Sequence, residues 1–145
     1  MNHFLMRRAP ILFGIAALVA CGSDSTGPST VPGPYVATEF VTTGSSGQTN
    51  QILAGSTLSL NLNPGGAVTG HLHLAATNGN PVFDADMAGV WLQTGNTITF
   101  SQAADTFVRN MTFNVVANGS FWQLEGDQVF SGTRIQITLD QQPTL

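Results

Sequence analysis

The chain has 145 residues, of which 42% are hydrophobic and only 8% are charged, and its formal net charge is −4. This composition excludes an extended disordered chain, because such chains combine low hydrophobicity with high net charge. It also disfavours nucleic-acid binding, since the four basic residues, all arginine, are too few to displace the counterions of a phosphate backbone. The length indicates a single domain.

The N-terminal residues have the pattern of an export signal. The basic segment Met6-Arg7-Arg8 precedes a nearly continuous apolar run of twelve residues from Ala9 to Ala20. Twelve helical residues rise about 18 Å, which is too short for the roughly 30 Å hydrocarbon core of a bilayer. The run therefore predicts a signal peptide over residues 1–20 rather than a spanning helix.

The end of this run, Leu18-Val19-Ala20-Cys21, resembles the bacterial lipobox, in which the cysteine is lipidated and the chain is cut just before it. The alternative is an ordinary signal peptide with an accidental cysteine nearby. Cys21 is the only cysteine of the chain, so no intramolecular disulfide can form. The resemblance implies a lipoprotein of a bacterial envelope, anchored through Cys21 to the outer membrane and facing the periplasm.

Cleavage would divide the chain into a tether and a domain. Cys21 and the Gly-, Ser- and Pro-rich residues 22–34 are expected to form a flexible tether, and residues 35–145 a folded domain. The mature chain would retain only Arg109 and Arg134 as basic residues and would carry a formal net charge of −6, because Arg7 and Arg8 leave with the signal.

The domain shows the two-residue period of half-buried strands. Leu58, Leu60 and Leu62 alternate with polar residues, and similar runs recur between Gly- and Asn-rich turns. About eight strands are predicted, near 35–43, 56–63, 67–76, 87–94, 96–101, 106–117, 120–126 and 132–140. Only residues 43–55 and 77–86 are expected to be long loops. Short links between about eight strands favour an all-β, antiparallel up-and-down barrel, with a β-sandwich as the alternative.

Four segments of the domain resemble small bacterial lipocalin-like lipoproteins. They are Gly55–Leu60, Gly89-Val90-Trp91, Gly95–Phe100 and Arg134–Leu139. Lipocalins carry a Gly-x-Trp triplet near the first strand, whereas the triplet lies in mid-chain here. The resemblance implies a barrel that binds a small apolar or amphipathic ligand in its lumen. The alternating pattern assigns the lumen to Leu58, Leu60, Leu72, Leu74, Phe100, Phe113, Ile135 and Ile137.

Arg109 is the most unusual charged residue of the domain. In a strand over 106–117 it would share the inward face with Phe107, Met111 and Phe113, and a buried arginine must be paired. Candidate partners are Asp105, Glu125 and Asp127. The side chain is an anion-recognising group at one end of the lumen, is turned outward by a bulge, or is part of a structural ion pair that closes the end of the barrel. The candidate ligand contacts are Arg109, Trp91, Phe100, Phe113 and Leu72. Further aromatic side chains that could stack on a ligand are Phe83, Phe121, Trp122 and Phe130.

Two short motifs contain residues that bind metals in other proteins. His71 and His73 lie two residues apart on one strand face, and Asp84 and Asp86 follow in an oxygen-rich loop. Because Leu72 and Leu74 occupy the inward face, the histidines are expected to face water, and no metal site is predicted. We also expect neither a cofactor nor catalysis, since nucleophile-elbow and phosphate-loop motifs are absent from the sequence. The alternative to ligand binding is a structural or interaction protein with a packed core and an unidentified protein partner.

The lipobox makes a direct prediction. Replacing Cys21 by Ala removes the acceptor of the lipid, so the protein should move from the membrane fraction to the soluble fraction of the envelope. Cell fractionation measures this, and a Cys21→Ala protein that stays with the membrane would show the lipobox assignment to be wrong.

Overall fold

The computed structural model describes residues 30–77 and 79–143, so the predicted signal peptide, Cys21 and most of the tether lie outside the described residues. Within them the secondary structure is almost entirely β. The strands are β1 (Gly33–Gly44), β2 (Gly47–Asn50), β3 (Thr57–Leu62), β4 (Ala67–Leu74), β5 (Phe83–Thr94), β6 (Thr97–Gln102), β7 (Phe113–Asn118), β8 (Phe121–Phe130) and β9 (Thr133–Gln141). One short helix, α1 (Phe107–Asn110), lies between β6 and β7.

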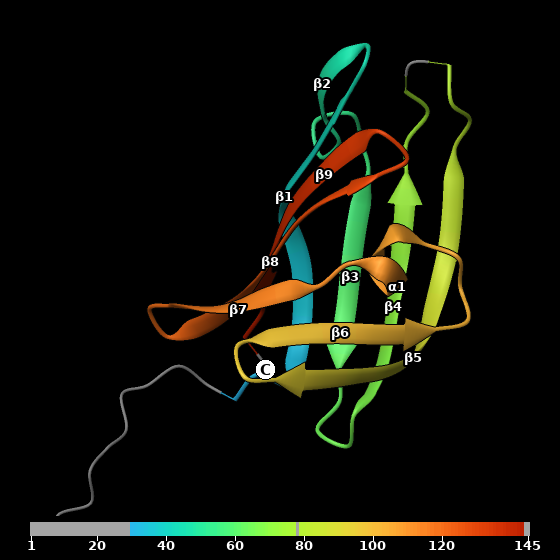
Figure 1. Ribbon diagram of the computed structural model, residues 1–145. Coiled ribbons are helices and arrows are strands. Elements are labelled where there is room, and N and C mark those ends of the chain that lie inside the picture. Colours follow the sequence, from blue (N-terminus) through green and yellow to red (C-terminus); the bar gives the residue numbers. More distant parts are fainter. Residues whose placement is uncertain (1–29, 78, 144–145) are drawn as a thin grey trace, which may run out of the picture.

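The strands form one closed antiparallel sheet. Their order is β2-β1-β3-β4-β5-β6-β7-β8-β9, and β1 also pairs with β9, which closes eight of the strands into a barrel. β2 is an extra strand that pairs only with the end of β1 and lies at the upper end of the barrel in Figure 1. The prediction of an all-β antiparallel barrel is therefore confirmed, and the sandwich alternative is wrong.

Two predicted loops contain strand residues instead. The segment 43–55 was expected to be a loop, but β1 extends to Gly44 and β2 follows it as a short hairpin. The segment 77–86 ends early, because β5 begins at Phe83 and pairs with β4 along its first residues. At the other end, β1 begins at Gly33, two residues inside the predicted tether.

The strand predicted over 106–117 is wrong in its first half. Residues 107–110 form α1, and only Phe113–Asn118 form β7. The buried residues Val108 and Met111 are three apart, which suits one helical turn as well as it suits an irregular strand. Arg109 consequently does not share an inward strand face with Phe113.

The interior of the barrel is a packed core. In β3 the side chains of Leu58, Leu60 and Leu62 are buried and the intervening ones are exposed, as the two-residue period predicted. Seven of the eight predicted lumen residues are buried, and Leu74 is half-buried at one end. Phe100 and Phe113 meet edge to face with ring centroids 5.5 Å apart. Most of the predicted lumen is therefore filled by side chains.

The chain enters the barrel at a polar clamp centred on Gln141. Its buried side-chain amide donates hydrogen bonds to the carbonyl oxygens of Thr30 (2.7 Å) and Pro32 (3.1 Å), and its oxygen accepts one from the backbone N–H of Trp122. The Tyr35 hydroxyl donates to the carbonyl of Val31 at 2.6 Å, and burial raises the pKa of Tyr35, which keeps this donor protonated. These contacts hold residues 30–32 at the end of the barrel opposite β2.

Gly89 is required where β5 approaches β6 most closely. A Cβ atom at this position would lie 2.0 Å from the backbone oxygen of Ser101, so alanine would force the two strands apart. We expect Gly89→Ala to lower the free energy of unfolding by about 2–3 kcal/mol. Gly65, whose Cβ would meet nothing within 4 Å, is the matched control, and Gly65→Ala should change it by less than about 0.5 kcal/mol. Urea denaturation measures the free energy of unfolding of both variants. Equal values for Gly89→Ala and Gly65→Ala would show that the contact between β5 and β6 does not require a glycine at position 89.

Candidate functional site

An apolar pocket opens at the end of the barrel that carries β2. It has a volume of about 370 Å³ and lies between the upper parts of β1, β4, β5 and β9, with Phe107 of α1 also in its wall. Its apolar lining consists of Phe40, Leu74, Ala75, Pro81, Phe83, Phe107 and Ile135. Its polar lining consists of Thr42, Gln51, Thr77, Asn80 and Thr133. The lining includes no Asp, Glu, Lys, Arg or His side chain.

The floor of this pocket is formed by aromatic contacts across the barrel. Phe40 of β1 is buried and packs against Phe107 of α1, with ring centroids 5.4 Å apart. Beyond this pair, Val108 and Met111 are buried in the core, so α1 closes the interior below the pocket. The pocket is thus a shallow apolar cup over a packed core.

Other hollows of the described residues are less suited to an apolar ligand. A depression over β1, β3 and β4 has an apolar lining that includes Pro34, Val36 and Leu60, but it is more open to solvent than the cup. Two others are more polar. One lies on the outer wall of the barrel and is lined by Glu39, Glu125 and Asp127 among polar neighbours. Another lies at the opposite end, beside the Gln141 clamp. The cup beside β2 combines an apolar lining with walls from several strands, which is the usual character of a small-molecule site.

The five predicted ligand contacts lie outside the cup. Leu72, Phe100 and Phe113 are buried in the packed core. Trp91 is half-buried, and its indole N–H donates to the carbonyl of Asn63 at 2.9 Å. Arg109, the fifth residue, pairs with Asp105. Contact of these five residues with a ligand stays a prediction.

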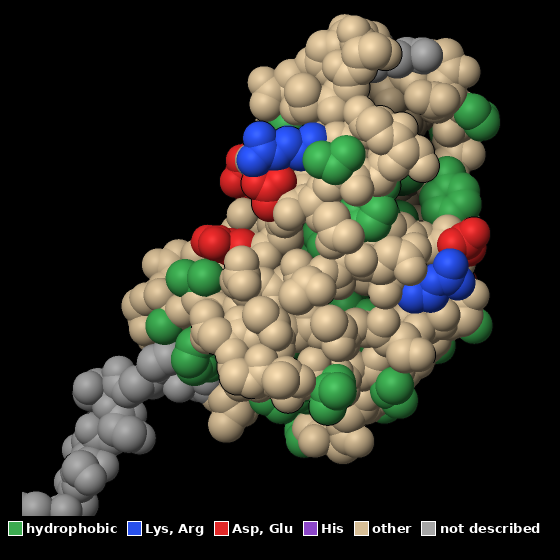
Figure 2. All heavy atoms as spheres, in the orientation of Figure 1, with side chains coloured by type: hydrophobic (Ala, Val, Ile, Leu, Met, Phe, Trp, Pro, Cys, Tyr) green, Lys and Arg blue, Asp and Glu red, His purple; other side chains and the backbone are tan. Residues whose placement is uncertain are grey.

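Arg109 forms a local ion pair with Asp105, one of its three candidate partners. The Nη2 atom of Arg109 lies 2.5 Å from the Oδ1 atom of Asp105, four residues earlier in the chain. Asp127, another candidate, binds Arg134 instead through two hydrogen bonds of 2.8 and 2.5 Å. In Figure 2, the basic side chains in view lie next to acidic ones, and most of this face is uncharged.

Most residues of the cup were not predicted from the sequence. Among them, only Leu74 and Ile135 were assigned to the lumen and Phe83 to the aromatic candidates. Phe40, Thr42 and Gln51 were not recognised. Phe83 was among the aromatic candidates, but its exposure of 42% at the start of β5 is a property of the folded chain that the sequence does not display.

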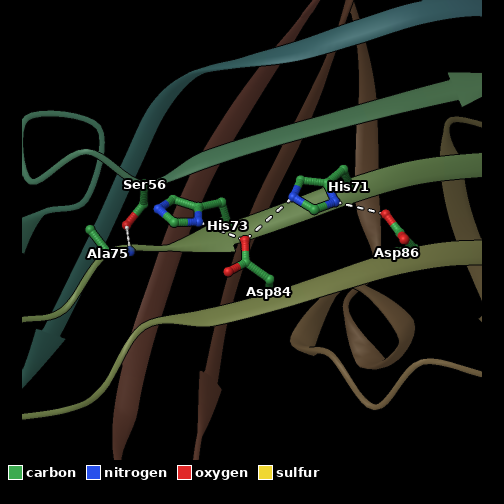
Figure 3. A network of polar contacts seen from close by, with 6 residues as sticks. All are labelled: Ser56, His71, His73, Ala75, Asp84 and Asp86. Atoms are coloured by element: carbon green, nitrogen blue, oxygen red, sulfur yellow. Dashed lines mark hydrogen bonds and ion pairs between the residues drawn. The ribbon is translucent and has the colours of Figure 1, made fainter.

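The four metal-ligand candidates do come together, on the outer wall of the barrel beside the cup. His71 and His73 of β4 pair across the strands with Asp86 and Asp84 of β5 (Figure 3). The Nδ1 atom of His71 is 2.8 Å from Oδ1 of Asp86, and that of His73 is 2.7 Å from Oδ1 of Asp84. The Asp84 oxygen also lies 3.5 Å from Nε2 of His71. The prediction that the two aspartates lie in a loop is wrong, because both belong to β5.

The hydrogen bonds and charges of this His–Asp network shift the pKa values of His71 and Asp84. The hydrogen bond with Asp86, helped by the charges of Asp86 and Asp84, raises the pKa of His71. Hydrogen bonding by His73, helped by the charges of both imidazoles, lowers the pKa of Asp84. Across residues 30–77 and 79–143, no three side chains of His, Cys, Asp or Glu are arranged to hold a metal ion. The network is thus a pair of cross-strand contacts that join β4 to β5.

No family model matches the chain, and no curated protein matches its sequence. One similar solved structure is a redesigned beta barrel, with 15% sequence identity, a TM-score of 0.38, and coverage of 77% of this chain and 91% of that chain. In the part of the chain that the structure describes, there is no helix with the length and apolar character needed to cross a membrane.

The network predicts a specific dependence on pH. Because the pKa of His71 is higher in the folded chain, its contribution to stability is complete below the ordinary histidine value of about 6.5 and is lost as pH rises through the raised pKa. The contribution of Asp84 is present above the ordinary aspartate pKa and is lost as pH falls through its lowered value. The network therefore stabilises the fold most at pH values above the ordinary aspartate pKa and below the ordinary histidine pKa.

We expect an NMR titration of the His71 imidazole to give a pKa above the ordinary value, and Asp86→Asn to bring it back toward that value. Asp140→Asn is the control, because Asp140 bonds Gln123 on another part of the barrel and should leave His71 unchanged. An unchanged His71 titration in Asp86→Asn would contradict the assignment.

Proposed function

We propose that this protein is a non-catalytic, lipid-anchored binding protein of a bacterial envelope that holds a small apolar or amphipathic ligand in the cup beside β2. The observation that carries the proposal is the apolar lining of that cup, about 370 Å³ in volume, at the open end of a closed barrel. Apolar ligand surface that leaves water there contributes roughly 25 cal/mol for each Å² buried. The polar side chains of the lining would set the orientation of the ligand.

The position of the cup relative to the proposed anchor supports this function. β1 begins at Gly33 beside the Gln141 clamp, and Phe40 and Thr42 bring its other end to the cup (Figure 1). Eight residues separate Cys21 from Thr30, the first residue held by the clamp, and when extended they allow a reach of about 30 Å. A lipid on Cys21 would thus hold the barrel near a membrane by the end opposite the cup, with the cup accessible from the periplasm.

The packed core restricts the proposed ligand to the end of the barrel. A lipocalin-like ligand deep in the lumen would have to displace Leu72, Phe100 and Phe113, all of which are buried. A ligand in the cup would instead contact Phe83, Leu74 and Ile135 without rearranging the core. We therefore propose that the ligand binding implied by the resemblance to lipocalin-like lipoproteins takes place in the cup and not deep in the lumen.

The alternative, a structural or interaction protein of the envelope, has one observation in its favour. The core leaves no deep lumen, and β2 presents a short strand edge that is paired only on its β1 side. An unpaired edge can accept a strand of a partner protein.

The experiment that separates these functions uses N-phenyl-1-naphthylamine, an uncharged fluorophore whose emission rises in apolar surroundings. We expect saturable binding to the wild-type protein. Phe83→Ser should weaken it about tenfold, because the loss of roughly 60 Å² of apolar contact corresponds to about 1.5 kcal/mol.

Leu92→Ser provides the matched control, since Leu92 is also an exposed apolar residue of β5 but lies outside the cup. This variant should bind the fluorophore like the wild type. Absence of saturable binding would refute the binding function and favour the interaction protein, and equal weakening by both substitutions would place the binding site outside the cup.

A further inference from the structure

We infer that the cup selects uncharged ligands that carry a hydrogen-bond acceptor, and that the hydroxyl group of Thr42 is the donor that recognises it. This inference rests on the proposed function and adds the ligand class and the residue that determines it. It derives from a chain of hydrogen bonds that ends at Thr42, and from the absence of charged side chains in the lining.

The hydrogen-bond chain begins at the end of β4 and crosses to β1. The backbone N–H of Ala75 donates to Oγ of Ser56 at 3.0 Å, a contact that Figure 3 also shows. Ser56 and Oε1 of Gln51 are 3.1 Å apart, and Nε2 of Gln51 lies 2.8 Å from Oγ1 of Thr42. Ser56 and Gln51 are buried, with 1% and 7% of their surfaces exposed, whereas Thr42 is only half-buried and lines the cup.

Burial fixes the direction in which the protons point. The Ser56 oxygen already accepts the N–H of Ala75, so its own proton needs an acceptor, and the neighbouring Gln51 oxygen is the one available. Leaving a buried hydroxyl proton unpaired would cost about 1–3 kcal/mol. With its oxygen bound to Ser56, the Gln51 amide must direct its NH₂ group at Thr42.

Thr42 is therefore an acceptor within this chain, and its own proton remains free to donate. Within the described residues, no hydrogen bond uses that proton, and the side chain forms part of the wall of the cup. The opposite amide orientation would make Thr42 a donor to Gln51, but it would leave the buried Ser56 proton without an acceptor. The fold thus presents one oriented hydroxyl donor to the cup.

The surroundings of the cup exclude a fully charged ligand group. No lining side chain carries a charge that could pair with one, and an unpaired charge in an apolar site is very unfavourable. Of the charged residues next to the lining along the chain, Arg134 and Asp84 are paired on the outer wall with Asp127 and His73. Glu39, next to Phe40, is exposed and accepts a hydrogen bond from the hydroxyl of Thr138. A ketone, ester, ether or alcohol attached to an apolar body fits these conditions, whereas a carboxylate does not.

The test compares decan-2-one with decanoate as competitors of N-phenyl-1-naphthylamine at pH 8, where decanoate is ionised. Decan-2-one should compete at least tenfold more tightly than decanoate. Thr42→Val, which keeps the shape and removes the hydroxyl, should weaken decan-2-one about fivefold, the equivalent of one ordinary hydrogen bond. The fluorophore offers no strong acceptor, so its own affinity should change less than twofold.

Two further variants serve as controls. Thr99→Val removes the hydroxyl of an exposed threonine of β6 that lies outside the cup, and it should leave decan-2-one binding within twofold of the wild type. Thr42→Ser retains the hydroxyl and should restore the affinity lost in Thr42→Val, which separates recognition from a general loss of stability.

The inference is overturned, while the proposed function stands, if the fluorophore binds but Thr42→Val leaves decan-2-one unaffected or decanoate competes equally well. It is also overturned if Thr42→Ser fails to restore binding. If the fluorophore does not bind to the wild-type protein at all, both the inference and the proposed function are wrong.

Discussion

The closing seam between β1 and β9 is the constraint on which the rest of the structure depends. Along this seam the register shifts between Ala37 and Glu39, so that Thr38 is an extra residue in β1. A bulge of this kind reverses which side chains of a strand face inward. Before it Tyr35 and Ala37 are buried, and after it Phe40 is buried.

Without the bulge, the residues of β1 would face the wrong way at the cup. Strict alternation from Tyr35 would turn Glu39 into the barrel and Phe40 outward, which would bury an acid that has no basic partner across the seam. With the bulge, Phe40 reaches Phe107 and Thr42 lies opposite Ile135 in the wall of the cup. The floor of the cup and its hydrogen-bond donor both follow from one inserted residue.

The sequence predicted the barrel because the fold depends on a pattern that a sequence displays directly. Alternation in β3 and β9 and turn residues between strands are local features, and they were sufficient for the eight strands of the barrel and their directions. The bulge, the hairpin of β2 and the turn of α1 depend on contacts between distant segments. Val108, for example, fits a strand or a helix equally well until the position of the core is known.

The difference between local patterns and contacts of distant segments also explains which candidate site residues were predicted correctly. His71 and Asp86 were recognised as chemically interesting, but only the antiparallel register of β4 and β5 brings them within hydrogen-bond distance. Arg109 looked like an inward strand residue because period-two alternation was continued across α1. In the helical turn the arginine meets Asp105 four residues earlier, a spacing that a helix uses and a strand does not.

The size of inward-facing side chains explains the apolar hollow at the end of the barrel beside β2. In the middle of the barrel these positions carry Leu58, Leu72, Met87 and Phe113, which fill the space between opposite strands. At the end beside β2 the lining instead includes Thr42, Ala75, Thr77 and Thr133, whose short side chains cannot meet across the opening. α1 limits the depth of this hollow, because Phe107 meets Phe40 and closes the way into the core. The cup is thus a consequence of small residues near the rim, and larger side chains there would extend the core to the end of the barrel.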